Sequence, residues 1–338
     1  MTWLAFRRHR TNLIIATGLV VALSGWMALV AHGFDTAPLK SFLQSSGSHG
    51  HDSIGHYRDI YGGPTILRLD YQVDAINLVL LALPCFLGVL LGVPLVAAEL
   101  ADHTNRVAWT QHISRTRWLS TKWWVIGLPL VILSTLVVLV TQWWWHHSVT
   151  SGLGSLFGTN LFGGSSRVQP EVFSVTGVVP VAYTLFAFAL GAAIGALARR
   201  VSWAIVGTIL VYAAASLIMA TTIRPNLAPK TFVASTQGFP SSSPLTDGGA
   251  PWYIGYGYQF SPGSHHPTDA SAADIGRRCE NLTGDFYACL THNDLRTGQF
   301  YQPASNYWTL QWKESAIYVI ASALLLAIGL WLVRRWRA

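Results

Sequence analysis

Residues 123–142 read WWVIGLPLVILSTLVVLVTQ, twenty consecutive residues without a charged side chain. At a rise of about 1.5 Å per residue, a helix of this length is about 30 Å long, which matches the hydrocarbon thickness of a bilayer. Residues 175–198, VTGVVPVAYTLFAFALGAAIGALA, form a second run of this kind. Both stretches predict α-helices that cross a membrane.

Four further charge-free runs have a similar length, which gives six predicted spans: 13–32, 75–98, 123–142, 175–198, 201–222 and 315–333. The chain has 338 residues, of which 51% are hydrophobic and only 11% are charged. A soluble chain carries about 25% charged residues. The first run could instead be a secretory signal peptide, but it is long for that role and lacks a clean cleavage site. The predicted fold is an all-α polytopic membrane protein with six transmembrane helices.

Basic residues are unevenly distributed over the segments between the spans. Twelve of the 22 Lys and Arg residues, with only two acidic residues, lie in four short segments: 1–12, 99–122, 199–200 and 334–338. Ten basic and 13 acidic residues lie in three longer segments: 33–74, 143–174 and 223–314. Short basic segments stay in the cytoplasm. Both termini are therefore predicted inside, and the large loop between the fifth and sixth helices outside; the net charge of +7 indicates topology, not nucleic-acid binding.

Within the spans, three local patterns carry structural predictions. Pro84 and Pro94 predict a kink or break in the second span. The Trp143–Trp145 triplet predicts an interfacial aromatic anchor. Gly191-x-x-x-Gly195 lets two helix backbones approach closely.

The outer segments contain several candidate sites. Cys279 and Cys289 are ten positions apart on the predicted outer side, where disulfides persist, and are expected to pair; two free thiols are the alternative. Four side chains in a Gly/Ser-rich segment are a weak candidate for a metal site: His49, His51, Asp52 and His56. The alternative is that they are simply solvated, as histidines in such loops usually are. Three acidic residues near outer helix ends are expected to be interfacial polar groups: Asp70, Asp74 and Glu314.

The missing features also restrict the function. No predicted span has a charged residue at its centre, which disfavours an ion-coupled transporter. The sequence contains no phosphate-binding G-x-x-x-x-G-K-[ST] loop, so energy for transport would have to come from another chain. Two alternatives to a transporter remain open: an enzyme embedded in the membrane, and a ligand-sensing subunit that presents its outer loops.

Segment 99–122 contains two possible helix starts. Thr104 or Asn105 can cap a short amphipathic helix, and Ser114 can cap the next helix, whose first turn holds Arg115 and Arg117. Such a helix either lies on the membrane surface or docks into a groove of a partner.

Here the chain resembles the permease subunits of ABC-2-type transporters of the actinobacterial kind. Three features carry the resemblance: the start WLAFRRHR at 3–10, the segment PLVAAEL at 94–100 followed by RVAWTQ at 106–111 and SRTRW at 114–118, and the six-span layout with a large outer loop before the last span. Close similarity covers about a tenth of the chain, and the 223–314 loop is long for the family.

The resemblance implies a permease in the bacterial plasma membrane, itself not an enzyme and without a cofactor. It would work as an exporter, with a separate ATPase subunit that binds ATP and Mg²⁺ and with a second permease copy in a homo- or heterodimer. The 99–122 loop would be the coupling helix. Carried over to this sequence, its ATPase-contacting residues would be Glu99, Thr104, Arg106, Trp109, Gln111, Arg115 and Arg117.

Overall fold

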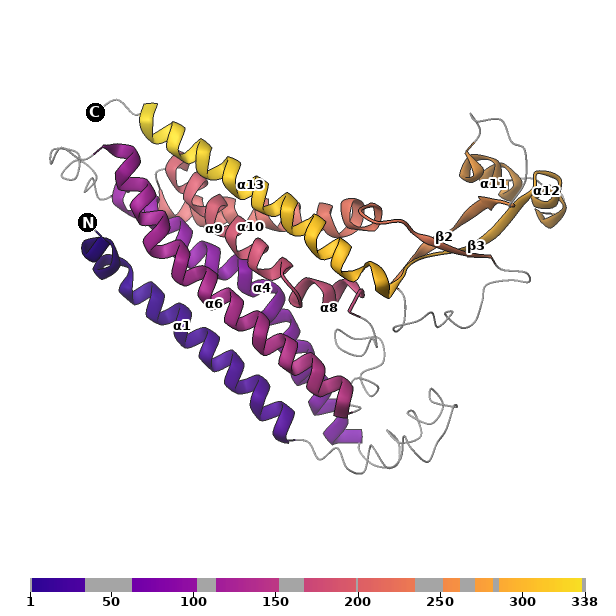
Figure 1. Cartoon of the computed structure of the whole chain (residues 1–338), viewed down its shortest axis with the longest axis horizontal. Coiled ribbons are helices and arrows are strands. Elements are labelled where there is room, and N and C mark those ends of the chain that lie inside the picture. Colours follow the sequence, from indigo (N-terminus) through magenta and orange to yellow (C-terminus); the bar gives the residue numbers. More distant parts are fainter. Residues whose placement is uncertain are drawn as a thin grey trace.

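The computed structural model describes residues 2–33, 63–101, 114–151, 167–198, 200–234, 252–261, 271–281 and 286–335. Six helical segments in these ranges are long and apolar enough to cross a membrane, which confirms the predicted fold class. They form a bundle with the N- and C-terminal ends at one end, and a small subdomain projects from the other (Figure 1). We call the end of the bundle that carries the two termini its inner end and the opposite end its outer end.

The six spans lie in helices that mostly extend beyond the apolar runs. These are α1 (Thr2–Gly33), α4 (Gly63–Ala101), α6 (Arg115–Ser151), α9 (Val179–Ala198), α10 (Val201–Ile218) and α13 (Tyr307–Arg335). Helix α10 continues through a π-helical turn, Met219–Ile223, and a 3₁₀ turn, Arg224–Asn226. At the start of α6, the backbone N–H of Arg117 donates to Ser114 Oγ over 3.3 Å, which confirms the predicted cap.

The second span does not break at its prolines. Helix α4 runs without interruption from Gly63 to Ala101 with Pro84 and Pro94 inside it. Neighbouring helices can compensate for the backbone hydrogen bonds that a proline removes from a membrane helix. Of the two predicted outcomes, a kink or a break, the break does not occur.

The backbones of helices α4 and α9 approach each other closely, and glycines permit this approach. A Cβ atom at Gly191 would lie 3.1 Å from Gly88 O, and one at Gly195 would lie 3.2 Å from Val93 O. On the facing helix, a Cβ at Gly92 would lie 2.5 Å from Phe188 O. The predicted role of the Gly191–Gly195 pair is confirmed. Helix α4 contributes a second Gly-x-x-x-Gly pair, Gly88 and Gly92, to the same contact.

The tryptophan triplet at the outer end of α6 is divided between two environments. Trp143 is exposed and stacks on His147 with ring centroids 5.7 Å apart. Trp144 and Trp145 are buried in the core that α1, α4 and α6 share. On a helix, three consecutive residues point in directions about 100° apart, so one of the three is placed as the predicted interfacial anchor and two are core residues.

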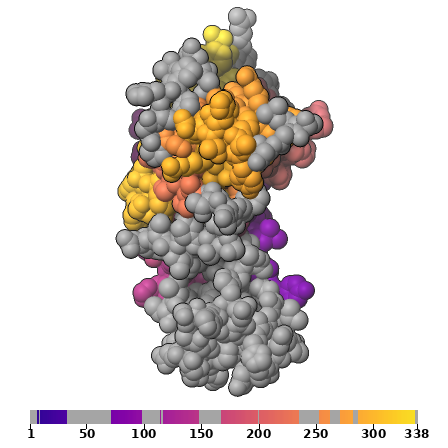
Figure 2. All heavy atoms as spheres, turned by 90° about the vertical axis from the view of Figure 1, so that its right-hand side faces the viewer, coloured from indigo at the N-terminus to yellow at the C-terminus, as the bar shows by residue number. Residues whose placement is uncertain are grey.

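The segment between α10 and α13 folds into an outer subdomain. Strands β1 (Thr231–Ala234), β2 (Trp252–Phe260) and β3 (Leu295–Gln302) form an antiparallel sheet in the order β1-β3-β2. Two short helices cover it, α11 (Ala272–Glu280) and α12 (Phe286–His292), and the predicted Cys279–Cys289 disulfide joins them. Viewed from this end, the subdomain (orange) lies beside the start of α13 (yellow) (Figure 2).

Candidate functional site

The fourth span is interrupted at its outer end. A short helix, α8 (Pro170–Val175), stops before Thr176, whose backbone is extended, and α9 begins only at Val179. At the break, Gly177 has a φ of 73°, a left-handed conformation that favours glycine. The polar backbone groups of residues 173–179 are buried at the edge of the bundle and require hydrogen-bond partners.

Gln311 of α13 supplies these partners with a single side chain. Its Oε1 accepts hydrogen bonds from the backbone N–H groups of Val178 and Val179 over 3.0 and 2.9 Å. Its Nε2 donates to the carbonyl oxygens of Phe173 and Thr176, both over 3.1 Å. The amide thus satisfies two donors and two acceptors of the interrupted helix and ties the fourth span to the sixth.

One turn before Gln311, Tyr307 adds another contact to the break. Its hydroxyl lies 3.1 Å from Thr176 Oγ1, and both atoms are buried. A Cβ atom at Gly177 would lie 2.6 Å from this hydroxyl and from Gln311 Oε1. Glycine is therefore required here for space as well as for its backbone conformation.

A buried ion pair lies next to the break. Arg224, at the end of the fifth span, donates from Nε to Glu314 Oε2 over 2.8 Å and from Nη2 to Glu314 Oε1 over 2.9 Å. The Nη2 atom also donates to the hydroxyl of Tyr183 over 2.7 Å, and this hydroxyl donates to Glu314 Oε1. Arg224 Nη1 lies 3.4 Å from the carbonyl of Pro170, and its guanidinium stacks 4.7 Å above the ring of Phe173. The cluster joins the fourth, fifth and sixth spans.

The cluster lies close to the start of α9. This helix has 20 residues, about one hydrocarbon thickness, and Tyr183 is its fifth residue, whereas Pro170 and Phe173, which Arg224 also contacts, belong to α8. The side chains of Arg224 and Glu314 are only 3% and 0% exposed. A buried charge without a partner is costly, which explains the bidentate geometry of the pair.

One prediction about charge is corrected by this cluster. Glu314 is expected from the sequence to be an interfacial polar group, but its side chain is fully buried. Helical structure extends beyond the uncharged runs, to Asn226 after the fifth run and from Tyr307 before the sixth. The bundle thus does contain an acid and a base, although each neutralises the other. A carboxylate saturated in this way is no free site for a coupling ion.

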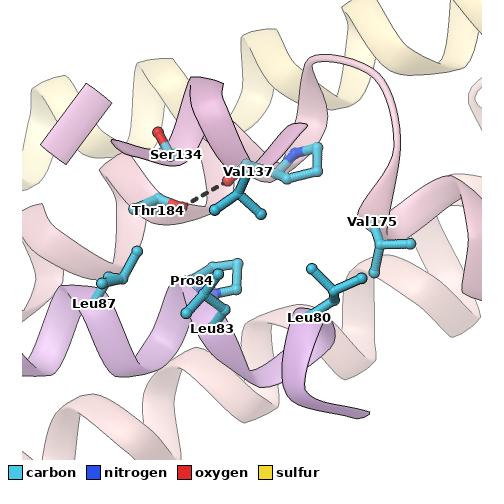
Figure 3. A pocket seen from close by; sticks show the side chains of 9 residues that line it. Leu80, Leu83, Pro84, Leu87, Ser134, Val137, Val175 and Thr184 are labelled. Carbon is cyan, nitrogen blue, oxygen red and sulfur yellow. Dashed lines mark hydrogen bonds between the residues drawn. The ribbon is translucent and has the colours of Figure 1, made fainter. Parts of the chain in front are cut away.

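A small apolar pocket lies between α4, α6 and α9 (Figure 3). Its lining comprises Leu80, Leu83, Pro84, Leu87, Ser134, Val137, Val175, Pro180 and Thr184. The hydroxyls of Ser134 and Thr184 donate to Val131 O and Pro180 O of their own helices. The cavity volume is about 10 Å³, roughly the space for one water molecule and far below the range of about 300–1,000 Å³ usual for ligand sites. This pocket alone is too small to be a translocation pathway.

The predicted coupling residues fall largely outside the described part of the chain. Thr104, Arg106, Trp109 and Gln111 lie in 102–113, which the structure does not describe, and only the backbones of Glu99 and Arg115 are described, within α4 and α6. Arg117 is exposed in the first turn of α6. The ends of α4 and α6 that flank this loop lie at the same end of the bundle as the two termini (Figure 1).

The four metal-site candidates, His49, His51, Asp52 and His56, also lie outside the described residues. Within the described ranges, no group of three or more His, Cys, Asp or Glu side chains is placed to hold a metal ion. That prediction has no structural test here.

The polar residues of α13 did carry a signal in the sequence. Its buried positions follow the spacing i, i+3, i+4, i+7, i+8 and i+11 of a single helix face: Tyr307, Leu310, Gln311, Glu314, Ser315 and Tyr318. Such periodicity marks a packed face, and it extends eight residues upstream of the charge-free run. A search for uncharged runs alone starts this helix at 315 and therefore leaves out most of the face.

Six packed spans with a folded subdomain between the fifth and the sixth define a multi-pass, mainly α-helical membrane protein. The sequence model of the family described as "ABC-2 membrane transporter related" matches residues 13–224. The match covers more than half of the chain, and the chain belongs to this family, the membrane-embedded permeases of ABC-2 type. Neither the comparison with curated proteins nor that with solved structures gives a match.

The matched residues cover the first five spans and end at Arg224. The partners of Arg224 on α13 and the whole outer subdomain lie beyond them. The resemblance proposed from local motifs is therefore confirmed at the level of the permease family.

Proposed function

We propose that this chain is the membrane subunit of an ABC exporter in a bacterial plasma membrane, driven by a separate ATPase subunit. The family match over 13–224 is the observation that carries the proposal. Both termini would be cytoplasmic, because the four short basic segments lie on that side. The ATPase would bind ATP and Mg²⁺, and this chain would need no cofactor of its own.

The proposal includes a second permease copy that completes the pathway. The apolar pocket between α4, α6 and α9 is too small to form a pathway within one chain. The outward faces of α10 and α13 are rich in exposed large apolar side chains, including Trp203, Leu210, Ile320 and Leu324. In a membrane such faces meet lipid or another helix bundle.

The 99–122 loop would transmit the ATPase cycle to the bundle. It connects α4 and α6, and α4 packs along α9 through the glycine contacts. A displacement of the loop would therefore act directly on the helix pair that reaches the break at Thr176–Val178. The coupling residues of this loop are Glu99, Thr104, Arg106, Trp109, Gln111, Arg115 and Arg117.

Purification of the tagged chain in mild detergent, with identification of the proteins that accompany it, tests the partnership. A Walker-type ATPase should co-purify. Trp109→Ala and Arg106→Glu should lower its recovery and the stimulated ATP hydrolysis, because both changes remove contacts of the coupling loop. Trp312→Ala, an exposed position on α13 near the outer end, is the matched control and should leave both measurements unchanged. Normal assembly and turnover in both loop variants would remove the coupling role.

A further inference from the structure

The two chain connections between the bundle and the outer subdomain lie against each other. One connection is 224–231, from the end of the fifth span to β1, and the other is 302–307, from β3 to the start of α13. Because Thr231 pairs with Tyr301 in the sheet, the two connections leave the subdomain side by side. Ordinary exposed loops would be free to move independently there.

Three side chains of the second connection and of α13 bind the backbone of the first. Gln302, fully buried, donates from Nε2 to the carbonyls of Pro225 and Ala228 over 3.2 and 2.9 Å. Asn306 donates from Nδ2 to Pro229 O over 2.9 Å and to Gln302 Oε1 over 2.8 Å. Lys313 Nζ donates to Leu227 O over 2.7 Å. We call Gln302, Asn306 and Lys313 the clamp.

The clamp borders directly on the buried ion pair. Pro225, which accepts a hydrogen bond from Gln302, follows Arg224 in the chain, and Lys313 precedes Glu314. Arg224 in turn reaches Pro170 at the start of α8, and Gln311 holds Val178 and Val179 at the start of α9. Hydrogen bonds and residues adjacent in the chain therefore connect the sheet to the interrupted fourth span.

We propose that the clamp residues are positioning residues: they join the outer subdomain and the outer ends of α10 and α13 into one mechanical body, and this body holds the α8–α9 break in place. Resting on the proposed transport function, this inference assigns the subdomain a role in it. A displacement of the subdomain therefore also displaces the start of the fourth span, because the two connections cannot move independently of the bundle.

Hydrogen exchange of the full-length chain in lipid nanodiscs, followed by mass spectrometry, tests the proposal. Gln302→Met removes two hydrogen bonds to the first connection while it keeps the side-chain volume. Exchange of the amides in 226–231 should become faster by about tenfold, the factor that corresponds to about 1.4 kcal/mol. The proposal also predicts an effect at the α8–α9 break, which Gln302 does not contact. The amides of Val178 and Val179 should exchange faster by at least about threefold.

Lys313→Met and Asn306→Ala are second variants at more exposed positions, which keep the test valid if Gln302→Met does not fold. Both should show the same paired change with a smaller amplitude, and Lys313→Arg, which retains a cationic donor, should restore wild-type exchange. Asn226→Ala is the matched control, since Asn226 Nδ2 donates over 2.7 Å to Thr222 O at the end of the same span and does not bridge the two connections. It should leave Val178 and Val179 unchanged.

Faster exchange confined to 226–231 in the clamp variants would overturn the proposal, and so would an equal effect of Asn226→Ala at Val178 and Val179. Hydrogen exchange in the isolated chain needs no ATPase and no cargo. A failure of the mechanical inference is therefore distinguishable from a failure of the proposed transport function, which the co-purification experiment tests.

Discussion

The two ends of α9 are held by different physical means. Toward the end where the chain termini lie, Gly191 and Gly195 fit against α4 with backbone atoms in close contact. At the outer end, Gln311 and the Arg224–Glu314 pair hold the same helix through polar groups. Lipid tails are as apolar as helix side chains, so no hydrophobic force drives helices together in a membrane, and close packing and hydrogen bonds must hold them. Helix α9 is held by close packing at its inner end and by hydrogen bonds at its outer end.

This difference indicates where the helix can move. Close-packed backbones transmit displacement but have no alternative arrangement of similar energy. A hydrogen-bonded break has donors and acceptors that can exchange partners. We therefore expect the inner end to act as the fixed contact and the outer end as the part that rearranges.

Removal of the acid from the ion pair should have the largest effect. Glu314→Leu leaves the Arg224 guanidinium buried without its counter-charge, which costs about 3–5 kcal/mol in free energy of unfolding. The yield of monodisperse protein in detergent and its thermal midpoint measure this loss. The double variant Arg224→Met with Glu314→Leu should recover most of it, because both charges are then absent. If the double variant is as unstable as the single one, the charge imbalance is not the cause.

Overpacking at the inner end should be the next largest effect. Gly92→Ala places a methyl group 2.5 Å from the backbone oxygen of Phe188, which cannot move aside as a side chain would. We expect a loss of about 1–3 kcal/mol, measured as a lower thermal midpoint in the same detergent. Gly25→Ala in α1 is the matched control, since no atom lies within 4 Å of the added methyl group. Equal midpoints for the two variants would contradict the close approach of α4 and α9.

A single hydroxyl at the outer end should give the smallest effect. Tyr307→Phe removes the contact with Thr176 Oγ1 and keeps the ring that packs against Phe173 with centroids 5.9 Å apart. We expect a loss of about 0.5–1.5 kcal/mol. Because the hydroxyl touches the break itself, amide exchange at 176–179 should become faster while exchange in α4 stays unchanged. A uniform change along the bundle would argue against a local polar contact.

Much of the membrane fold follows from the sequence because its signals are local. Six uncharged runs, the Ser114 cap, the Gly191–Gly195 spacing and the Cys279–Cys289 pair each lie within one short segment, and the structure contains all of them. The prolines of α4 do not interrupt the helix, because a proline breaks a helix only if nothing around it compensates. Surrounding helices decide that outcome, and the sequence of α4 does not contain them.

The candidate site could be predicted only in part because its contacts are long-range. Arg224 and Glu314 are 90 positions apart, and Gln311 lies more than 130 positions from the N–H groups that it accepts from. Each of these residues looks like an ordinary polar residue next to a span when taken alone. The helical spacing of Tyr307, Gln311 and Glu314 was the available signal, and it shows that the polar groups share a face but not what that face meets.

The separation of Arg224 and Glu314 has a consequence for biosynthesis. At about 5–20 residues per second, the ribosome completes Glu314 roughly 5–20 s after Arg224. During this interval the guanidinium has no counter-charge, and the fifth helix is better accommodated with its end displaced toward the water. The end of the fifth helix therefore reaches its final position only after the sixth helix has entered the bilayer, although the fifth helix is synthesised first.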